Sequence, residues 1–143
     1  METRIVLVTG GFDPLHSGHI EYFKEAKKLG NKLIVGLNSD KWLTRKKGKP
    51  FMSFDERKLI IENLSMVNRV ISFKDDDDTA CDAIYQLIKI DHQIIFANGG
   101  DRTKENSPEY DTYSKLPWVR FEFNVGGEKI TSSKRLLDAW TKQ

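Results

Sequence analysis

Hydrophobic residues along this chain fall into short apolar runs separated by longer stretches with helical spacing. Apolar runs without strict polar alternation are typical of strands buried on both faces of a parallel sheet. Four such runs are present, and a fifth segment alternates apolar with charged residues. The pattern therefore predicts strands over residues 3–8, 32–37, 69–73, 93–97 and 118–123.

Helical spacing occupies the stretches between these runs. It predicts helices over residues 17–29, 53–63 and 80–89, and a last one from 131–133 to about 140. Strands that alternate with helices indicate an α/β fold with a doubly wound parallel sheet. Ligands of such sheets bind at the carboxyl ends of the strands, so the turns after the first and fourth strands should meet there with the start of the last helix.

Short polar motifs predict where these helices begin and end. We expect Ser17 to cap the first helix and Gly30-Asn31 to stop it with a residue suited to positive φ. Ser53 and Glu56 have the spacing of a capping box. The apolar residues expected to be buried in the helix that follows are Leu59, Ile60 and Leu64.

Three polar stretches predict loops or turns. Residues 41–50 carry five cations, and residues 102–117 are polar and hold two prolines. Residues 74–79 are acidic, which raises the possibility of a metal site. A solvated turn whose last aspartate, Asp78, caps the next helix is the favoured interpretation.

Composition narrows the class of protein. The 143 residues suit a single domain over 1–143, and 23 basic against 21 acidic residues give a net charge of +2, which argues against a dedicated nucleic-acid coat. A single cysteine, Cys81, excludes an internal disulfide and suits a reducing cytoplasm. No signal peptide or membrane-length apolar run is present, so we expect a cytoplasmic protein without a membrane partner.

The stretch 10–19, GGFDPLHSGH, joins the first predicted strand to the first predicted helix. Backbone N–H groups at a helix N-terminus lack intrahelical partners and carry partial positive charge, so they suit an anion. Glycines let the backbone approach that anion, and His16 and His19 add donors on one side of the turn. The stretch therefore predicts a phosphate-binding turn. It is not a Walker loop, and Gly48-Lys49 precedes Pro50 rather than Ser or Thr.

His16 and His19 have two further interpretations, as structural histidines or as a zinc pair. A pair of histidines three residues apart is a weak metal motif, and no cysteine or third histidine lies at a matching spacing. Phosphate binding is the favoured interpretation. Their protonation state stays open, because the helix dipole disfavours the cation while a bound phosphate favours it.

The spacing of Gly10, Phe12-Asp13, His16 and Gly18-His19 resembles the motif of the cytidylyltransferase-like nucleotidyltransferases, which have a Rossmann-like fold. The resemblance implies that both histidines contact a triphosphate and stabilise charge at its α-phosphorus. It extends to the Gly99 turn, near the nucleoside, and to residues 130–133, where hydroxyl and N–H groups take the outer phosphates. The residues it implies for nucleotide binding are Gly10, Gly11, Phe12, Asp13, His16, Gly18, His19, Gly99, Gly100, Asp101, Thr131, Ser132 and Ser133.

Asp13 could be an ordinary turn residue. Beside a triphosphate site, a carboxylate is expected to help hold Mg²⁺, which binds through a carboxylate and substrate phosphates. We therefore predict Mg²⁺ as a cofactor with Asp13 as its protein ligand.

The cations of residues 41–50 could be an ordinary solvated surface. They follow the second strand on the ligand side, and the reaction would bring several anions together. The resemblance to the glycerol-3-phosphate cytidylyltransferases implies phosphate contacts from such a basic segment. Lys46 is the first choice for catalysis and substrate binding, and Lys49 the second. Arg57 resembles a family arginine that binds the phosphorylated substrate, although it could equally be a surface residue.

One departure from the family concerns the residues before the C-terminal motif. Many members carry Arg-Thr-x-Gly there, whereas this chain has Gly126-Gly127-Glu128-Lys129. The usual arginine is missing, and Lys129, Lys134 or Arg135 could replace it.

The sequence predicts an enzyme that moves a nucleoside monophosphate from an NTP to a small phosphorylated or phosphonylated molecule. The resemblance to glycerol-3-phosphate cytidylyltransferases makes CTP the first expectation. The heptose-phosphate adenylyltransferases share the opening motif, so ATP with a sugar phosphate is the alternative. A non-catalytic nucleotide-binding module is an alternative of another class, and a nucleic-acid-binding surface at residues 41–49 is a further one. A homodimer is carried over from the family.

Overall fold

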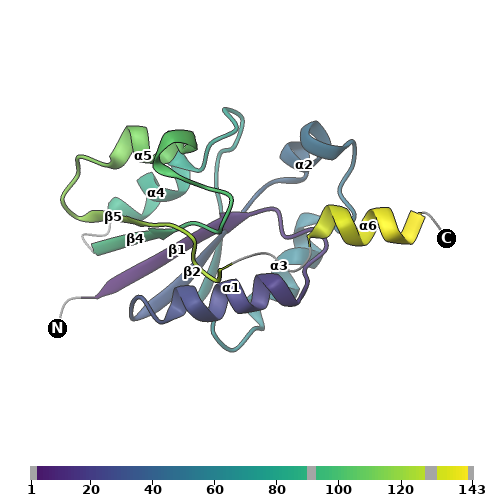
Figure 1. Cartoon of the computed structure of the whole chain (residues 1–143), viewed down its shortest axis with the longest axis horizontal. Helices are drawn as coiled ribbons and strands as arrows, with labels where there is room; N and C mark the ends of the chain where they lie inside the picture. The colour runs from purple at the N-terminus through teal and green to yellow at the C-terminus, as the bar shows by residue number, and fades with distance from the viewer. Residues whose placement is uncertain (1–2, 90–92, 128–131, 142–143) are drawn as a thin grey trace.

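A sheet of five parallel strands forms the middle of the molecule, whose computed structural model describes residues 3–89, 93–127 and 132–141 (Figure 1). Its order is β3-β2-β1-β4-β5. The strands are β1 (Arg4–Gly10), β2 (Lys32–Leu37), β3 (Arg69–Ser72), β4 (Gln93–Ala97) and β5 (Val119–Glu122). The predicted doubly wound parallel sheet is confirmed, and each predicted strand is present within a few residues.

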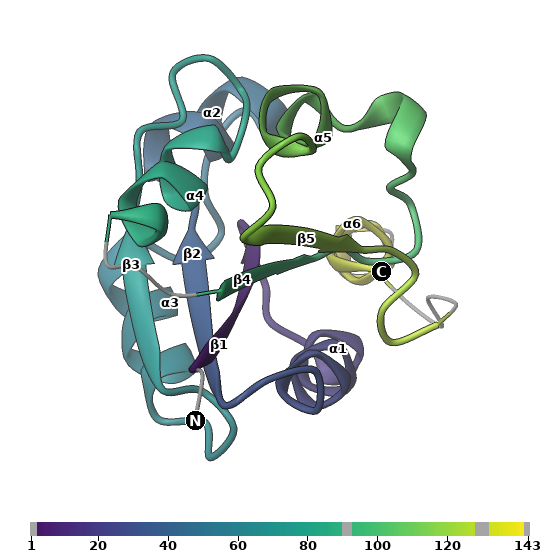
Figure 2. The same cartoon turned by 90° about the vertical axis from the view of Figure 1, so that its left-hand side faces the viewer.

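Strand β1 lies in the centre because it pairs with β2 on one side and with β4 on the other (Figure 2). Ile5 is opposite Lys32 in β2 and opposite Ile94 in β4. The chain therefore winds outward in opposite directions from β1, and the crevice between the carboxyl ends of β1 and β4 is the switch point where such sheets bind ligands.

Helices cover both faces of this sheet (Figure 1). Val6 and Val8 of β1 pack in one core cluster with Phe23 and Ile61. Residues on the opposite face of β1 pack with α4 (Cys81–Ile88). The helices are α1 (Ser17–Lys27), α2 (Asp40–Lys47), α3 (Phe54–Glu62), α4 (Cys81–Ile88), the short 3₁₀ turn η1 (Lys104–Asn106), α5 (Pro108–Tyr113) and α6 (Ser133–Thr141). None of the described helices is long and apolar enough to cross a membrane.

The ends of α1 differ from the prediction. His16, not Ser17, is the N-cap residue. The helix ends at Lys27, and Gly30 does not have positive φ. A Cβ on Gly30 would lie 2.6 Å from the carbonyl oxygen of Arg4 and 2.9 Å from Val6. Close packing against β1, rather than backbone conformation, therefore explains this glycine.

The prediction of a loop over residues 41–50 is wrong, because most of this segment is helix α2. Ser39 caps it by accepting a hydrogen bond from the N–H of Trp42 at 3.1 Å. Asp40 lies in the first turn and three cations in the last, which suits the helix dipole, and Gly48 follows with φ 95°. Leu43 is its only buried residue, so the segment lacks the apolar pattern that predicts a helix.

Helix α3 begins at the predicted place, but a different face of it is buried. The N–H of Glu56 donates to Ser53 at 3.3 Å, which is one half of the predicted capping box. Leu59 is 57% exposed, and the other two apolar residues expected inside are half-buried. Arg57 and Ile61, one helical turn apart, face inward instead.

The acidic stretch 74–79 is not solvated throughout. Asp75 is buried and accepts hydrogen bonds from the N–H and hydroxyl of Ser39, both at 2.8 Å. Asp78 does not cap α4, whose N-cap residue Ala80 has no side-chain cap of its own. The N–H of Ala80 instead donates to Glu109 at 2.9 Å, from a segment distant in sequence.

Residues 102–117 are not a continuous loop, because η1 and α5 lie within them. Ser107 caps α5 by accepting from the N–H of Tyr110 at 3.1 Å, and Pro108 stands in the first turn. Proline suits that position because its missing N–H would have no helical partner.

Candidate functional site

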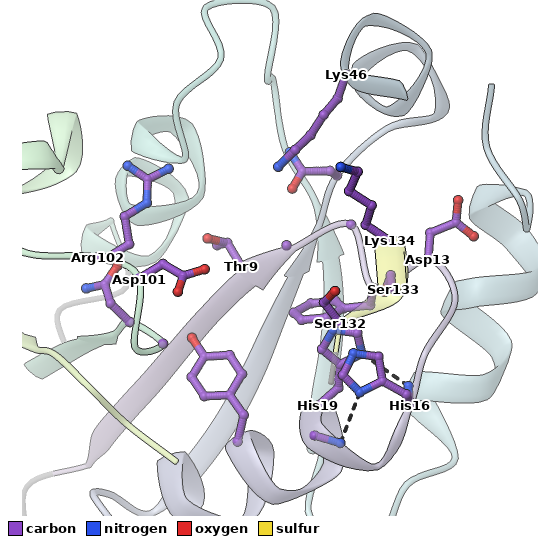
Figure 3. A pocket seen from close by; sticks show the side chains of 18 of the residues that line it. Thr9, Asp13, His16, His19, Lys46, Asp101, Arg102, Ser132, Ser133 and Lys134 are labelled. Carbon is purple, nitrogen blue, oxygen red and sulfur yellow. Dashed lines mark hydrogen bonds between the residues drawn. The ribbon is translucent and has the colours of Figure 1, made fainter. Parts of the chain in front are cut away.

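A cleft of about 1490 Å³ lies at the carboxyl ends of β1 and β4 (Figure 3). The turn after β1, helix α2, the Gly99 turn and the start of α6 line it. Thr131 lies outside the described residues, and Arg57 is not among the lining residues. The other predicted site residues all line the cleft, namely Gly10, Gly11, Phe12, Asp13, His16, Gly18, His19, Lys46, Lys49, Gly99, Gly100, Asp101, Ser132 and Ser133.

His16 and His19 are held by the helix they begin. The N–H of Gly18 donates to Nδ1 of His16 at 3.0 Å, and the N–H of His16 donates to Nδ1 of His19 at 3.2 Å (Figure 3). The two side chains thus form a capping box. Gly18 permits this approach, since a Cβ there would lie 2.8 Å from Cε1 of His16.

These hydrogen bonds fix the tautomer of both rings. A nitrogen that accepts a hydrogen bond carries no proton, so the ring proton of each neutral histidine is on Nε2. The rings stack with centroids 3.8 Å apart, a spacing at which two cations would repel. Both histidines, each protonated on Nε2, line the cleft.

Phe12 shapes this turn from beneath. Its backbone has φ 50°, in the left-handed region, and its ring is buried edge-on against His19 and Phe23, with centroids 5.0 Å apart in both cases. The backbone conformation costs roughly 1–2 kcal/mol, and burying the ring contributes about 1.5–3 kcal/mol. The ring holds the turn over the core, so Phe12 contributes to a ligand site through the shape of the turn.

Asp13 is engaged by its own chain. Its side chain has no exposed surface and forms an ion pair with Lys47 at 2.9 Å. Its two carboxylate oxygens accept the N–H groups of Phe51 and Met52, each at 2.6 Å. These contacts argue against the predicted Mg²⁺ role for Asp13. Among the described residues no group of three His, Cys, Asp or Glu side chains could hold a metal.

Arg57 is likewise engaged within the fold. Its guanidinium donates to the carbonyls of Met52 at 3.0 Å and of Gly11 and Asn38 at 2.9 Å. Nη2 pairs with Asp40 at 2.7 Å. The side chain is fully buried, so the structure does not bring Arg57 to the position of a substrate ligand.

Lys46 projects from α2 toward the cleft (Figure 3). Its ammonium lies 4.6 Å from the centroid of the Trp42 ring, within cation–π distance. Lys49 also lines the cleft. Trp42 was missed by sequence reasoning, because a loop interpretation gave no reason to pair residues four apart.

The Gly99 turn lines the cleft together with the histidines, and Tyr22 links α1 to the end of β4, just before this turn. The Tyr22 hydroxyl donates to the carbonyl of Ala97 at the end of β4. Burial raises the pKa of Tyr22 well above its usual value, so the phenol keeps its proton and stays a donor. Tyr22 was also missed, since its place in an apolar helical pattern indicates only core packing.

Helix α6 brings the C-terminal motif to the phosphate turn. The Ser133 hydroxyl donates to the carbonyl of Pro14 at 2.7 Å, and Ser132 caps the helix by accepting from the N–H of Arg135 at 3.1 Å. Of the candidates to replace the missing arginine, Lys134 lines the cleft, Arg135 is not among the lining residues and Lys129 lies outside the described residues (Figure 3).

Comparison with known proteins gives one family. The model of the family described as "Cytidylyltransferase-like" matches residues 7–136. The chain is 33% identical over 138 residues to "Bifunctional protein HldE" of Aliarcobacter butzleri, covering 94% of this chain and 27% of that protein. The HldE of Wolinella succinogenes is 40% identical over 120 residues, covering 82% and 24%. The chain thus spans about a quarter of the length of these relatives.

Solved structures are also similar to this chain. A lipopolysaccharide core biosynthesis protein from Thermoplasma volcanium superposes with a TM-score of 0.67 and 29% identity, covering 85% of this chain and 95% of that one. A bifunctional NMN adenylyltransferase/ADP ribose pyrophosphatase from Francisella tularensis gives a TM-score of 0.66 over all of this chain and 43% of that one. At 16% identity the latter shows the fold alone.

Proposed function

Because the chain belongs to the cytidylyltransferase-like family of nucleotidyltransferases, we propose that it transfers AMP from ATP to a sugar phosphate with release of pyrophosphate. The single observation that carries the proposal is the paired capping of His16 and His19, which holds both rings in one tautomer at the cleft. Donors held in place before the reaction stabilise charge that develops on a transferring phosphoryl group.

The relatives support adenylyl transfer, the alternative expectation, better than the CMP transfer expected first. Proteins named HldE recur among the relatives, and the structure at 29% identity is named for lipopolysaccharide core biosynthesis, which is sugar chemistry. CMP transfer from CTP to a phosphorylated alcohol remains the second candidate, because the glycerol-3-phosphate cytidylyltransferases and the heptose-phosphate adenylyltransferases share the opening motif.

In the proposed reaction a phosphate oxygen of the acceptor attacks the α-phosphorus of ATP. A P–O bond forms to the acceptor, the bond from the α-phosphorus to the bridging oxygen breaks, and pyrophosphate leaves with that electron pair. The protein supplies no nucleophile, so its contribution is positioning and charge stabilisation. Nε2–H groups of His16 and His19 donate to the α-phosphoryl oxygens, while Lys46 and Lys49 attract the acceptor phosphate.

Mg²⁺ stays a prediction, and its predicted ligand Asp13 is engaged within the fold. The carboxylate of Asp13 is already taken by two backbone N–H groups and Lys47, so no step of the proposed reaction is assigned to the metal. A homodimer, a cytoplasmic location, and a single domain over residues 1–143 likewise remain predictions.

The direct test measures pyrophosphate release from ATP, CTP, GTP and UTP with a panel of sugar phosphates and glycerol 3-phosphate. We expect release with ATP and a sugar phosphate. Release only with CTP and an alcohol phosphate would select the second candidate. Nucleotide binding without pyrophosphate release from any pair would identify a non-catalytic nucleotide-binding module. Binding of nucleic acid with a steep salt dependence would favour the alternative of a nucleic-acid-binding surface at residues 41–49.

His16 offers a matched pair of variants. Asn is a good N-cap residue, so His16→Asn keeps an acceptor for the N–H of Gly18 while it removes the Nε2–H donor. His16→Ala removes both. We expect both variants to lose turnover by about 10²–10³-fold, and only the alanine variant to lose about 0.5–2 kcal/mol of unfolding free energy. Full turnover in the folded asparagine variant would contradict the catalytic role.

A further inference from the structure

The buried charges of Asp13 and Arg57 meet at one residue, Met52. Asp13 accepts the N–H of Met52 at 2.6 Å, and Arg57 donates to the carbonyl of Met52 at 3.0 Å. Arg57 also donates to the carbonyl of Gly11, two residues before Asp13, at 2.9 Å. The contacts close a ring between the phosphate turn and the segment between α2 and α3, which we call the buckle (Gly11, Asp13, Met52 and Arg57).

The buckle extends to both ends of α2. At the start of the helix, Arg57 pairs with Asp40 at 2.7 Å and donates to the carbonyl of Asn38 at 2.9 Å. At its end, Lys47 pairs with Asp13 at 2.9 Å and donates to the carbonyl of Asp13 at 2.6 Å. The helix that presents Lys46 is thus fixed to the phosphate turn at two points.

Neither side chain has surface left for a ligand. The side chains of Asp13 and Arg57 are both 0% exposed. An unpaired charge at such a depth would be costly, and here each is neutralised and hydrogen-bonded by protein groups. Breaking such a pair from one side leaves an uncompensated partner, so the arrangement holds its geometry tightly.

We propose that Asp13 and Arg57 are positioning residues, which set the acceptor-binding segment 40–52 at a fixed distance from the nucleotide-binding turn. The proposal rests on the proposed function, because an in-line transfer needs two bound anions in register. Misplacement of reacting groups by about 1 Å costs on the order of 10²-fold in rate. A metal ligand at residue 13 and a substrate ligand at residue 57 are the roles it replaces.

The test uses Asp13→Asn, Arg57→Lys and the double variant, with Lys58→Gln as a matched control. Lys58 is exposed on the same helix as Arg57 and takes no part in the buckle. We expect each buckle variant to lower kcat/KM for the acceptor by about 10–100-fold, through kcat as well as KM. The ATP-induced rise in melting temperature should persist, and the control should match the wild type.

The double variant, the Mg²⁺ dependence of Asp13→Asn and the kinetics of Arg57→Lys decide between positioning and direct contact. If the two residues act through one buckle, the losses in the double variant are far less than multiplicative, because one break already frees the segment. Multiplicative losses, or an Asp13→Asn defect that is restored by raising the Mg²⁺ concentration, would overturn the proposal. An Arg57→Lys variant with wild-type kcat and a raised acceptor KM would also overturn it, since that result marks a direct phosphate contact.

Failure of the proposed function would be recognised separately, as no pyrophosphate release by the wild type with any pair. The same double-variant comparison then applies to the free energy of unfolding, where additive losses would overturn the buckle. If the buried variants do not fold, Lys47→Gln breaks the ion pair from a side chain that is 27% exposed. It should give the same acceptor-selective loss, and an unchanged acceptor kcat/KM would overturn the proposal.

Discussion

Asp75 shows how a single buried carboxylate fixes a segment that carries site residues. It accepts hydrogen bonds from the N–H and hydroxyl of Ser39 at 2.8 Å and from the side chain of Asn38 at 3.1 Å. Burial raises its pKa, but these hydrogen bonds and the charge of Arg45 outweigh burial, so the pKa of Asp75 lies below its ordinary 3.8. The start of α2 therefore depends on an ionised carboxylate.

This charge predicts a pH dependence of stability. A carboxyl group with a lowered pKa in the folded state stabilises the fold above its unfolded-state pKa, and the contribution is lost as the pH falls through the folded pKa. Asp75→Asn should cost about 1–3 kcal/mol of unfolding free energy at pH 7, and less below pH 3.8. Urea unfolding of the wild type and the variant, at pH 7 and again below pH 3.8, measures the difference. Asp76→Asn, an exposed neighbour, is the control, and an equal loss in both variants would contradict the prediction.

Single residues were the hardest features to predict. The positions of His16 and His19 follow from a motif, and the structure brings them to the cleft as expected. The roles of Asp13 and Arg57 depend on hydrogen bonds to the backbone N–H and carbonyl groups of Met52. Backbone groups are the same at every position of a sequence, so no residue pattern indicates which of them a buried charge will meet.

At the scale of elements, apolar runs predicted the strands well because both faces of a central parallel strand are buried. Helix α2 escaped prediction because only Leu43 is buried and the remaining residues read as a charged loop. Its formation depends on the Ser39 cap and on Asp75, which lies in a different segment. A short helix fixed by tertiary contacts leaves little periodic pattern in its own sequence.

The join between α1 and β2 gives a test at this scale. Gly30→Ala would place a Cβ 2.6 Å from the backbone oxygen of Arg4, so the loop must shift. We expect a loss of about 1–3 kcal/mol in unfolding free energy, as for an overpacked core. Gly99→Ala is the matched control, because nothing lies within 4 Å of a Cβ there. Equal unfolding midpoints for the two variants in urea would contradict this explanation of Gly30.

At the scale of the whole molecule, the site consists of four segments that are separate in sequence, namely the turn after β1, helix α2, the Gly99 turn and the start of α6. The sheet order places the turns after β1 and β4 side by side, and Ser133 brings α6 to Pro14. This convergence was predictable, because ligands gather at the carboxyl ends of a doubly wound sheet. The identity of the nucleotide was not predictable, because Gly99 and Gly100, in the turn that faces the histidines, have no side chain that could distinguish one base from another.

Nucleotide choice can be measured on the intact protein by thermal shift. A ligand at about 100 times its Kd adds roughly 2.7 kcal/mol to stability, which raises Tm by about 5–10 °C for a domain of this size. We expect ATP to give the largest rise among ATP, CTP, GTP and UTP. Inorganic pyrophosphate is the control for contacts that do not involve the nucleoside. A larger rise with CTP would select CMP transfer.

The central place of β1 has a consequence for synthesis on the ribosome. One edge of β1 pairs with β2, which is translated soon afterwards. The other edge pairs with β4, where Arg4 is opposite Gln93, so this edge stays open until β4 has been translated. An uncovered apolar strand edge is a template for association with other chains. The nascent chain therefore passes through an interval in which this edge of β1 is open to pairing with other chains. Nucleotide binding cannot shorten this interval, because the Gly99 turn, which lines the cleft, follows β4.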